Sequence, residues 1–226
     1  MNSLKKTARI AGFLYLAYFV AFFVADNGVH YTAVGPVDGA AMVDNMIASE
    51  GLFRIGFVSF ILAAVLFLSS AWALYVLLKP VNKDLALLFL VLNLAGVAIK
   101  CASLLCEFAV LVLLSGADYL QVFQADQLQA MAILFLNLYQ NGFMIAQIFF
   151  GVWLLPLGYL VFKSGFLPKI LGILLIVDCF AILIWFFQFF LFPGYEAISD
   201  LCLLESFIAE AALCLWLVIK GANVKQ

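Results

Sequence analysis

The sequence predicts an all-α membrane protein, a six-transmembrane-helix bundle with both termini in the cytoplasm. Of its 226 residues, 68% are apolar and 11% charged, and the mean hydropathy is +1.20. A soluble domain is about half apolar and roughly a quarter charged. The apolar residues form six runs, each able to cross a hydrocarbon core of about 30 Å. The cations gather in the loops of one side, which the positive-inside rule assigns to the cytoplasm.

The six runs lie within one predicted integral membrane domain, residues 1–226. They occupy residues 11–25, 55–78, 85–114, 131–162, 170–192 and 201–219. A spanning helix needs about 20 residues, so the first run is short, while the third and fourth are long enough to tilt or protrude. The first run is expected to be a retained helix, because Phe23 stands where signal cleavage needs a small side chain.

Two further segments carry helix signals. Apolar residues at helical spacing predict an outer amphipathic segment at about residues 38–50, lying in the headgroup layer. A docking surface or a lid over a cavity is the alternative for this segment. Asp126 and Gln129 form a capping-box pattern, so the fourth helix is expected to begin in water before it enters the bilayer.

The orientation follows from the positions of the eleven lysines and arginines. All but two precede the first span, lie in the second-to-third or fourth-to-fifth connection, or follow the sixth span. The exceptions are Lys100, inside the third span, and Arg54, among the acids of the opposite side. The even number of spans agrees with two termini on one side of the membrane.

Several function classes are not expected. The net charge of -2 and the lack of a basic run argue against nucleic acid as a partner. The five cysteines lie inside apolar runs and His30 lies in a loop, so neither a disulfide framework nor a metal site is predicted. No G-x-S-x-G, H-E-x-x-H or phosphate-loop motif occurs, so we predict no catalytic residue, no cofactor and no enzyme activity.

Charged residues inside the spans are the main candidates for function: Lys100, Glu107, Asp178, Glu205 and Glu210. A charge at the bilayer centre costs about 2.5 to 3.5 kcal/mol even on the lenient insertion scale. These side chains therefore need pairing, protonation or a wet cavity. One lysine cannot neutralise four carboxylates, and carboxylates crowded at one depth cannot all stay ionised.

The depth of each group follows from counting about 1.5 Å per residue from the cytoplasmic lysines. Asp178 and Glu210 are expected roughly 14 to 15 Å deep, close to the middle of the core. Lys100, Glu205 and Gln147 form a second layer at roughly 23 to 25 Å. Polar content thus increases from the midplane outward, which predicts an outward-facing acidic pocket.

Lys100 needs a partner on another helix. Glu107 shares its helix face but lies about 10.5 Å further along the axis, near the outer boundary, which is too far for an intrahelical pair. Side chains on a helix lean toward its N-terminus, which turns the ammonium toward Asp178 and Glu210. Glu205 is the alternative partner.

Two helices carry stripes of polar and small residues at helical spacing, and these stripes are expected to face each other. The stripe of the third span consists of Asn93, Gly96, Lys100, Ser103 and Glu107, and that of the fourth of Asn137, Gln140, Met144, Gln147 and Gly151. Gln147 and the neighbouring Asn141 are added to the candidate ligand-binding or proton-binding residues. Small and amide residues also serve as ordinary helix-packing contacts.

Several blocks together resemble a known family. They read RIAGFLYL from Arg9, ASEGLFRIGF from Ala48, LYVLLKPVNKDLAL from Leu74, SGADYL from Ser115 and SGFLPKILG from Ser164. The chain resembles, over nearly its whole length, the uncharacterised bacterial multi-pass membrane family known as domain of unknown function 4386. This resemblance implies a six-helix bundle in the bacterial cytoplasmic membrane, and it carries no established activity, substrate or catalytic residue.

Two hypotheses of function follow. In the first, the protein binds or transports a small polar or cationic solute, linked to protons, through the acidic pocket. In the second, it is a non-catalytic structural or assembly protein in which the buried charges fix helix packing. The lipid bilayer is the expected partner in both.

Overall fold

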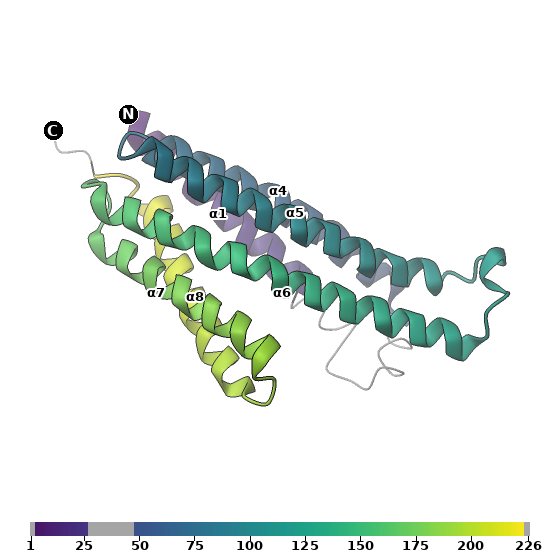
Figure 1. Ribbon diagram of the computed structural model, residues 1–226. Coiled ribbons are helices and arrows are strands. Elements are labelled where there is room, and N and C mark those ends of the chain that lie inside the picture. The colour runs from purple at the N-terminus through teal and green to yellow at the C-terminus, as the bar shows by residue number, and fades with distance from the viewer. Residues whose placement is uncertain (1–2, 27–47, 224–226) are drawn as a thin grey trace. The chain divides into compact units, whose positions relative to one another are not determined.

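The computed structural model describes residues 3–26 and 48–223, and within them the regular structure is helical (Figure 1). The elements are α1 (Ser3–Phe23), α4 (Glu50–Leu78), α5 (Lys83–Leu113), the short 3-10 helix η2 (Asp118–Leu120), α6 (Ala125–Lys163), α7 (Lys169–Leu191) and α8 (Glu196–Ile219). In this described part, six helices are long and apolar enough to cross a membrane. They coincide with the six predicted spans, so the all-helical class and the number of spans are confirmed.

Local sequence explains where these helices begin and end. The N–H of Leu85 donates to the side-chain oxygen of Asn82 (3.0 Å), which caps the start of α5. Pro168 precedes α7 in an extended conformation, as proline favours at a helix start. Gly221 follows α8 with a φ of 69°, and its N–H donates to the carbonyl oxygen of Trp216 (3.0 Å), which closes the last turn.

The start of α6 corrects the predicted capping box. The helix does begin before the predicted span, at Ala125. The Gln127 side chain accepts a hydrogen bond from the N–H of Gln124 (2.9 Å), whereas Asp126 bonds to the N–H of Gln127 (3.0 Å). The cap therefore joins Gln124 and Gln127 through this one bond, and the predicted Asp126–Gln129 capping box was wrong because Asp126 already lies in the first helical turn.

Two predicted features, the amphipathic segment and the loop histidine, lie wholly or largely outside the described residues. The amphipathic segment at residues 38–50 lies outside the described residues except for residues 48–50, the last of which begins α4. His30 also lies outside them.

The chain divides into two compact units, and each is assembled from separate segments of sequence. Of the described residues, the first unit comprises 3–17, 66–98 and 144–223, and it contains all of α7 and α8. The second comprises residues 18–26, 48–65 and 99–143, with η2. Segments of α1, α4, α5 and α6 occur in both. That residues 1–226 form one domain stays a prediction.

Glycines set the helix contacts of the first unit. A Cβ atom built on Gly158 of α6 would lie 2.7 Å from the carbonyl oxygen of Gly172 of α7, so the two backbones are in direct contact. A Cβ on Gly12 of α1 would lie 2.7 Å from the backbone nitrogen of Val218 of α8. Close approach at small residues is the usual way in which helices associate in lipid, because van der Waals packing replaces the hydrophobic effect there.

Aromatic side chains fill the interior of this unit. Phe67 of α4 contacts Tyr15 of α1 and Trp153 of α6, with ring centroids 5.9 and 5.2 Å apart. Trp153 also contacts Phe89 of α5, at 6.1 Å. Because these rings belong to four different helices, their packing ties α1, α4, α5 and α6 into one core.

The second unit has two small apolar clusters. The first consists of Phe53, Val110, Leu111, Ala132 and Leu136, and the second of Ala25, Phe60, Leu104 and Tyr139. Gly142 of α6 packs directly on Ser103 of α5. These clusters join the segments of α1, α4, α5 and α6 that belong to the second unit.

The two polar stripes have different outcomes. All five stripe residues of α5 are buried, as predicted. On α6, Met144 and Gly151 are buried and Gln147 is half-buried, but Asn137 and Gln140 are exposed, so the predicted stripe is wrong at those two positions. The α6 positions that meet the α5 stripe include Gly142 and, opposite Gly96, Phe150.

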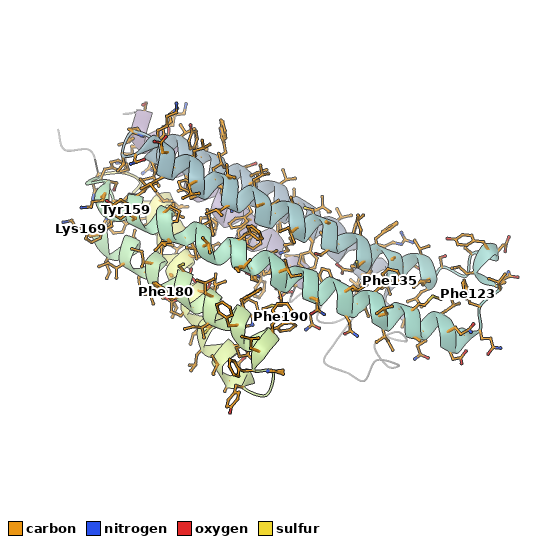
Figure 2. All side chains as sticks on the ribbon, in the orientation of Figure 1. Phe123, Phe135, Tyr159, Lys169, Phe180 and Phe190 are labelled. Carbon is orange, nitrogen blue, oxygen red and sulfur yellow. The ribbon has the colours of Figure 1, made fainter. Side chains whose placement is uncertain are left out.

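The outward surface of the helices is apolar, as a hydrocarbon solvent requires. Phe180 and Phe190 project from α7 and are 56% and 40% exposed, and Figure 2 shows them along that helix. Tyr159 of α6 and Lys169 of α7 lie at the same end of this helix pair (Figure 2). Lys169 thus lies at the start of α7, and exposed aromatic rings lie further along it.

We predict that Gly158→Ala destabilises the protein by about 1 to 3 kcal/mol, because the added methyl group meets a backbone oxygen that cannot move aside. The measurement is thermal unfolding of the purified protein in one detergent, followed by circular dichroism. Gly51→Ala is the matched control, since a Cβ at Gly51 meets nothing within 4 Å. Equal midpoints for the two variants would contradict the α6–α7 contact.

Candidate functional site

Asp178 is the most deeply buried acid of the first unit. It lies on α7 among buried neighbours that include Leu175, Cys179 and Ile182, and its side chain is 0% exposed. Both of its carboxylate oxygens are buried and make no hydrogen bond of good geometry within the described residues. Burying an ionised carboxylate in this way is strongly unfavourable unless a proton or a cation neutralises it.

Helix α8 packs against α7 and brings two further acids to Asp178. The carboxylate of Glu205 acts electrostatically on Asp178, and both of these act on Glu210. Glu205 and Glu210 are themselves half-buried. We call Asp178, Glu205 and Glu210 the acid cluster.

Two hydroxyl groups border the acid cluster. The Ser206 hydroxyl is the donor next to Asp178, although the geometry between them falls short of a good hydrogen bond. The hydroxyl of Tyr15, from α1, lies beside the carboxyl group of Glu210. A hydroxyl can both donate and accept, so each can follow its neighbouring carboxyl group through a change of protonation.

The charged groups that act on the acid cluster are negative. Within the described residues, the groups that act on Asp178 and Glu210 are other carboxylates and the two hydroxyls, without a lysine or arginine. The same part of the chain contains no group of three or more His, Cys, Asp or Glu residues arranged to hold a metal ion. The acid cluster can accept protons. It can also accept a cation, provided that the cation does not need three His, Cys, Asp or Glu ligands at once.

Other polar groups in the first unit are also buried. Asn93 is fully buried, and neither its amide nitrogen nor its oxygen has a hydrogen-bond partner in the described chain. The same holds for the indole N–H of Trp153. Buried polar groups of this kind in proteins are commonly satisfied by ordered water.

In the second unit, Lys100 is held by aromatic rings. Its side chain is 7% exposed, and its nitrogen lies 4.3 Å from the ring centroid of Phe22, 5.0 Å from that of Phe143 and 5.3 Å from that of Phe60. We call these three rings the aromatic cage. A desolvated ammonium over ring faces gains about 2 kcal/mol or more from each favourable cation–π contact.

Two acids add to the field around Lys100. Asp26, in the π-helical turn that follows α1, and Glu107 of α5 both act electrostatically on the ammonium. Glu107 is almost completely buried. Lys100 therefore has, inside its own unit, rings and acids that favour its charge and oppose the cost of burying it.

The predicted candidates thus divide between two places. Asp178, Glu205 and Glu210 come together in the first unit, whereas Lys100 and Glu107 belong to the second. The pairing of Lys100 with the acid cluster stays a prediction, and so does a common outward-facing pocket.

The two amide candidates also fall in different units. Gln147 lies half-buried in the first unit. Asn141 is exposed in the second, and its side-chain nitrogen donates to the carbonyl oxygen of Asn137 (2.7 Å) on the same helix. The Asn141 amide is therefore used along α6, while Gln147 is the better placed of the two for a role in the first unit.

Sequence reasoning missed the partners of these charges. Ser206 follows Glu205 directly, and Tyr15 lies in the middle of α1, so their depth could have been estimated from the sequence. The rings of the aromatic cage could not be selected, because the chain has 24 phenylalanines and nothing local distinguishes those three.

The fold and its buried ionisable groups define an all-helical membrane protein. The chain belongs to the family described as Domain of unknown function (DUF4386), whose model matches residues 10–221, and this confirms the resemblance seen in the sequence. It is 29% identical over 169 residues to an uncharacterised protein of Archaeoglobus fulgidus, an alignment that covers 75% of this chain and 85% of that protein. No solved structure matches.

Proposed function

We propose that this protein binds and carries a small cationic solute or protons at the acid cluster, as a multi-pass protein of the bacterial cytoplasmic membrane without enzyme activity. One observation carries the proposal: Asp178 is fully buried, its oxygens lack good hydrogen bonds in the described chain, and its charged neighbours are carboxylates. A site built in this way needs positive charge from outside the described residues.

The proposal rests on the energetics of buried acids. An uncompensated ion in a low-dielectric interior is destabilising, and removing the partner from a buried ion pair costs about 3 to 5 kcal/mol. A proton or a bound cation at the acid cluster relieves this cost. Binding and protonation then compete for the same carboxylates, which couples the solute to protons.

The direction of access is part of the proposal. The distribution of lysine and arginine supports both termini in the cytoplasm. With that orientation, Glu205 precedes Glu210 along α8 and lies nearer to the outer surface. Because Glu205 is half-buried and acts on Asp178, it is suited to pass a proton or cation from the outside to the buried acid.

We predict that the acid cluster titrates as a unit. Infrared difference spectra of the protein in nanodiscs, recorded over a pH series, should contain the high-frequency C=O band of a carboxylic acid in apolar surroundings. Asp178→Asn and Glu210→Gln should each weaken this band and change the pH at which the remaining band appears. In the matched control, Glu50→Gln, the band should not change, because Glu50 is exposed and paired with Arg54 (2.7 Å).

The same variants test solute binding. Methylammonium chloride added to the wild type in weak buffer should displace protons, which a pH indicator reports. Asp178→Asn, Glu205→Gln and Glu210→Gln should each weaken the response at least about tenfold, since losing one partner of a buried charge interaction costs about 2 kcal/mol or more. If all three variants keep both the wild-type titration and the wild-type proton release, the acid cluster is not the binding site.

A structural role is the second candidate, and the aromatic cage favours it for Lys100. The ammonium contacts rings from α1, α4 and α6, while the lysine itself belongs to α5. A single buried cation thereby links four helices of the second unit. Such a group can fix helix register without binding any solute.

We predict that Lys100→Met lowers the free energy of unfolding by about 3 to 5 kcal/mol, because Asp26 and Glu107 lose their compensating charge. Lys100→Met/Glu107→Gln should recover part of this loss. Unfolding in mixed detergent micelles measures both, and the exposed Lys220→Met should change stability by less than about 0.5 kcal/mol. A double variant no more stable than Lys100→Met alone would argue against charge compensation.

A further inference from the structure

An open apolar groove lies in the first unit, apart from the acid cluster. It has a volume of about 570 Å³, within the range of about 300 to 1,000 Å³ typical of ligand sites. Segments of α1, α4 and α5 form its walls. The apolar residues that line it include Ile10, Leu14, Leu68, Trp72, Leu90 and Leu94.

The apolar lining of the groove disfavours polar and ionic ligands. Apart from the Ser69 hydroxyl and the edge of the Trp72 indole, it presents hydrocarbon. Trp72 is 58% exposed, so the groove opens on the surface that faces lipid. A polar or ionic solute would lose its hydration there without new hydrogen bonds, whereas a hydrocarbon chain would not.

The groove lies within one leaflet. Its deepest residues, Leu68 and Leu94, each lie eleven residues from the lysine at the end of their helix, Lys79 and Lys83 respectively. That separation is about 16 Å of helix rise, or about half of a hydrocarbon core of about 30 Å. The lining residues of each helix are four or five residues apart, which is about 6 to 8 Å of rise, so the groove occupies the half of this leaflet that is nearer to the midplane. Phospholipid acyl chains lie at this depth.

Each helix that lines the groove carries a lysine toward this membrane surface, at helical spacing from a lining residue. Lys6 precedes Ile10 by four residues, Lys79 follows Trp72 by seven, and Lys83 precedes Leu90 by seven. Residues four or seven apart share a helix face. All three lysines are exposed, and Asp84 is the acidic residue among them.

Aromatic contacts connect the groove to these charges. The Trp72 ring contacts Tyr75, with centroids 5.4 Å apart, and the Lys79 nitrogen lies 5.8 Å from the Tyr75 centroid. Trp and Tyr are favoured at the depth of lipid glycerol and headgroups. One face of α4 thus passes from hydrocarbon through aromatic rings to a cation within seven residues.

We propose that this groove is a binding site for an anionic phospholipid. One acyl chain lies along Ile10, Trp72 and Leu94, and the phosphate group lies among Lys6, Lys79 and Lys83. Charge complementarity selects an anionic lipid over a zwitterionic one, because each lysine near the surface contributes attraction to a negative headgroup. The site is independent of the solute proposed for the acid cluster.

The test uses the full chain in nanodiscs of phosphatidylcholine mixed with phosphatidylglycerol. After extraction into detergent, mass spectrometry counts the phosphatidylglycerol that stays bound. Lys6→Gln/Lys79→Gln/Lys83→Gln should lower its retention at least about tenfold, since each lysine is worth roughly fivefold in affinity. Ser69→Phe, which fills the groove, should abolish retention while the lysines remain.

Matched variants separate this site from general effects. Lys163→Gln/Lys169→Gln/Lys220→Gln removes the same charge from exposed lysines of α6, α7 and the end of α8, and it should retain phosphatidylglycerol as the wild type does. Leu62→Phe adds a ring at an exposed position of α4 outside the groove and should do the same.

Three results would overturn the proposal. The first is equal loss of lipid in both triple-lysine variants, which would indicate non-specific attraction. The second is wild-type retention in Ser69→Phe. The third is a dimer on size exclusion that Ser69→Phe dissociates, because a second copy would then occupy the groove. Circular dichroism of every variant checks that the helices are intact.

Discussion

A polar group that enters hydrocarbon must find its partner inside the protein, and this constraint determines how the chain is built. The backbone meets it by forming helices, whose ends are closed by groups such as Asn82 and Gly221. Gly158 and Gly172 then let α6 and α7 pack closely through van der Waals contacts of their backbones. Charged side chains have no equivalent general solution, and each must be compensated by its own neighbours.

The two units compensate their charges in opposite ways. In the second, Lys100 is surrounded by three rings and two acids, so groups of the chain itself favour its charge. In the first, the acid cluster contains several carboxylates and hydroxyls, and within the described residues no cation acts on Asp178 or Glu210. This difference supports the structural role proposed for Lys100 and the binding of protons or cations proposed for the acid cluster.

The sequence predicts the helices well because their signal is local and repeated. Long apolar runs, Pro168 before α7 and Gly221 after α8 each act within a few residues. The capping box at α6 shows the limit of such signals, since a shift of two residues exchanged Asp126 for Gln124 as the N-cap.

The sites were harder to predict because they depend on which helix faces which. Counting residues gave similar depths to Asp178 and Glu210, and the structure brings these acids together. No count could assign Phe22, Phe60 and Phe143 to Lys100, because a ring packs equally well against lipid or against its neighbours. Depth is thus readable from one sequence, whereas the direction of a side chain around its helix is not.

Asp178 and Glu210 interact as like charges without a compensating cation among the described residues, and a double-mutant cycle measures this interaction. The free energy of unfolding is measured for the wild type, Asp178→Asn, Glu210→Gln and the double variant at one pH. Because either replacement relieves the crowding of like charges, the second should have the smaller effect, with a coupling of about 0.5 to 3 kcal/mol. Effects that add to within about 0.3 kcal/mol would contradict the account.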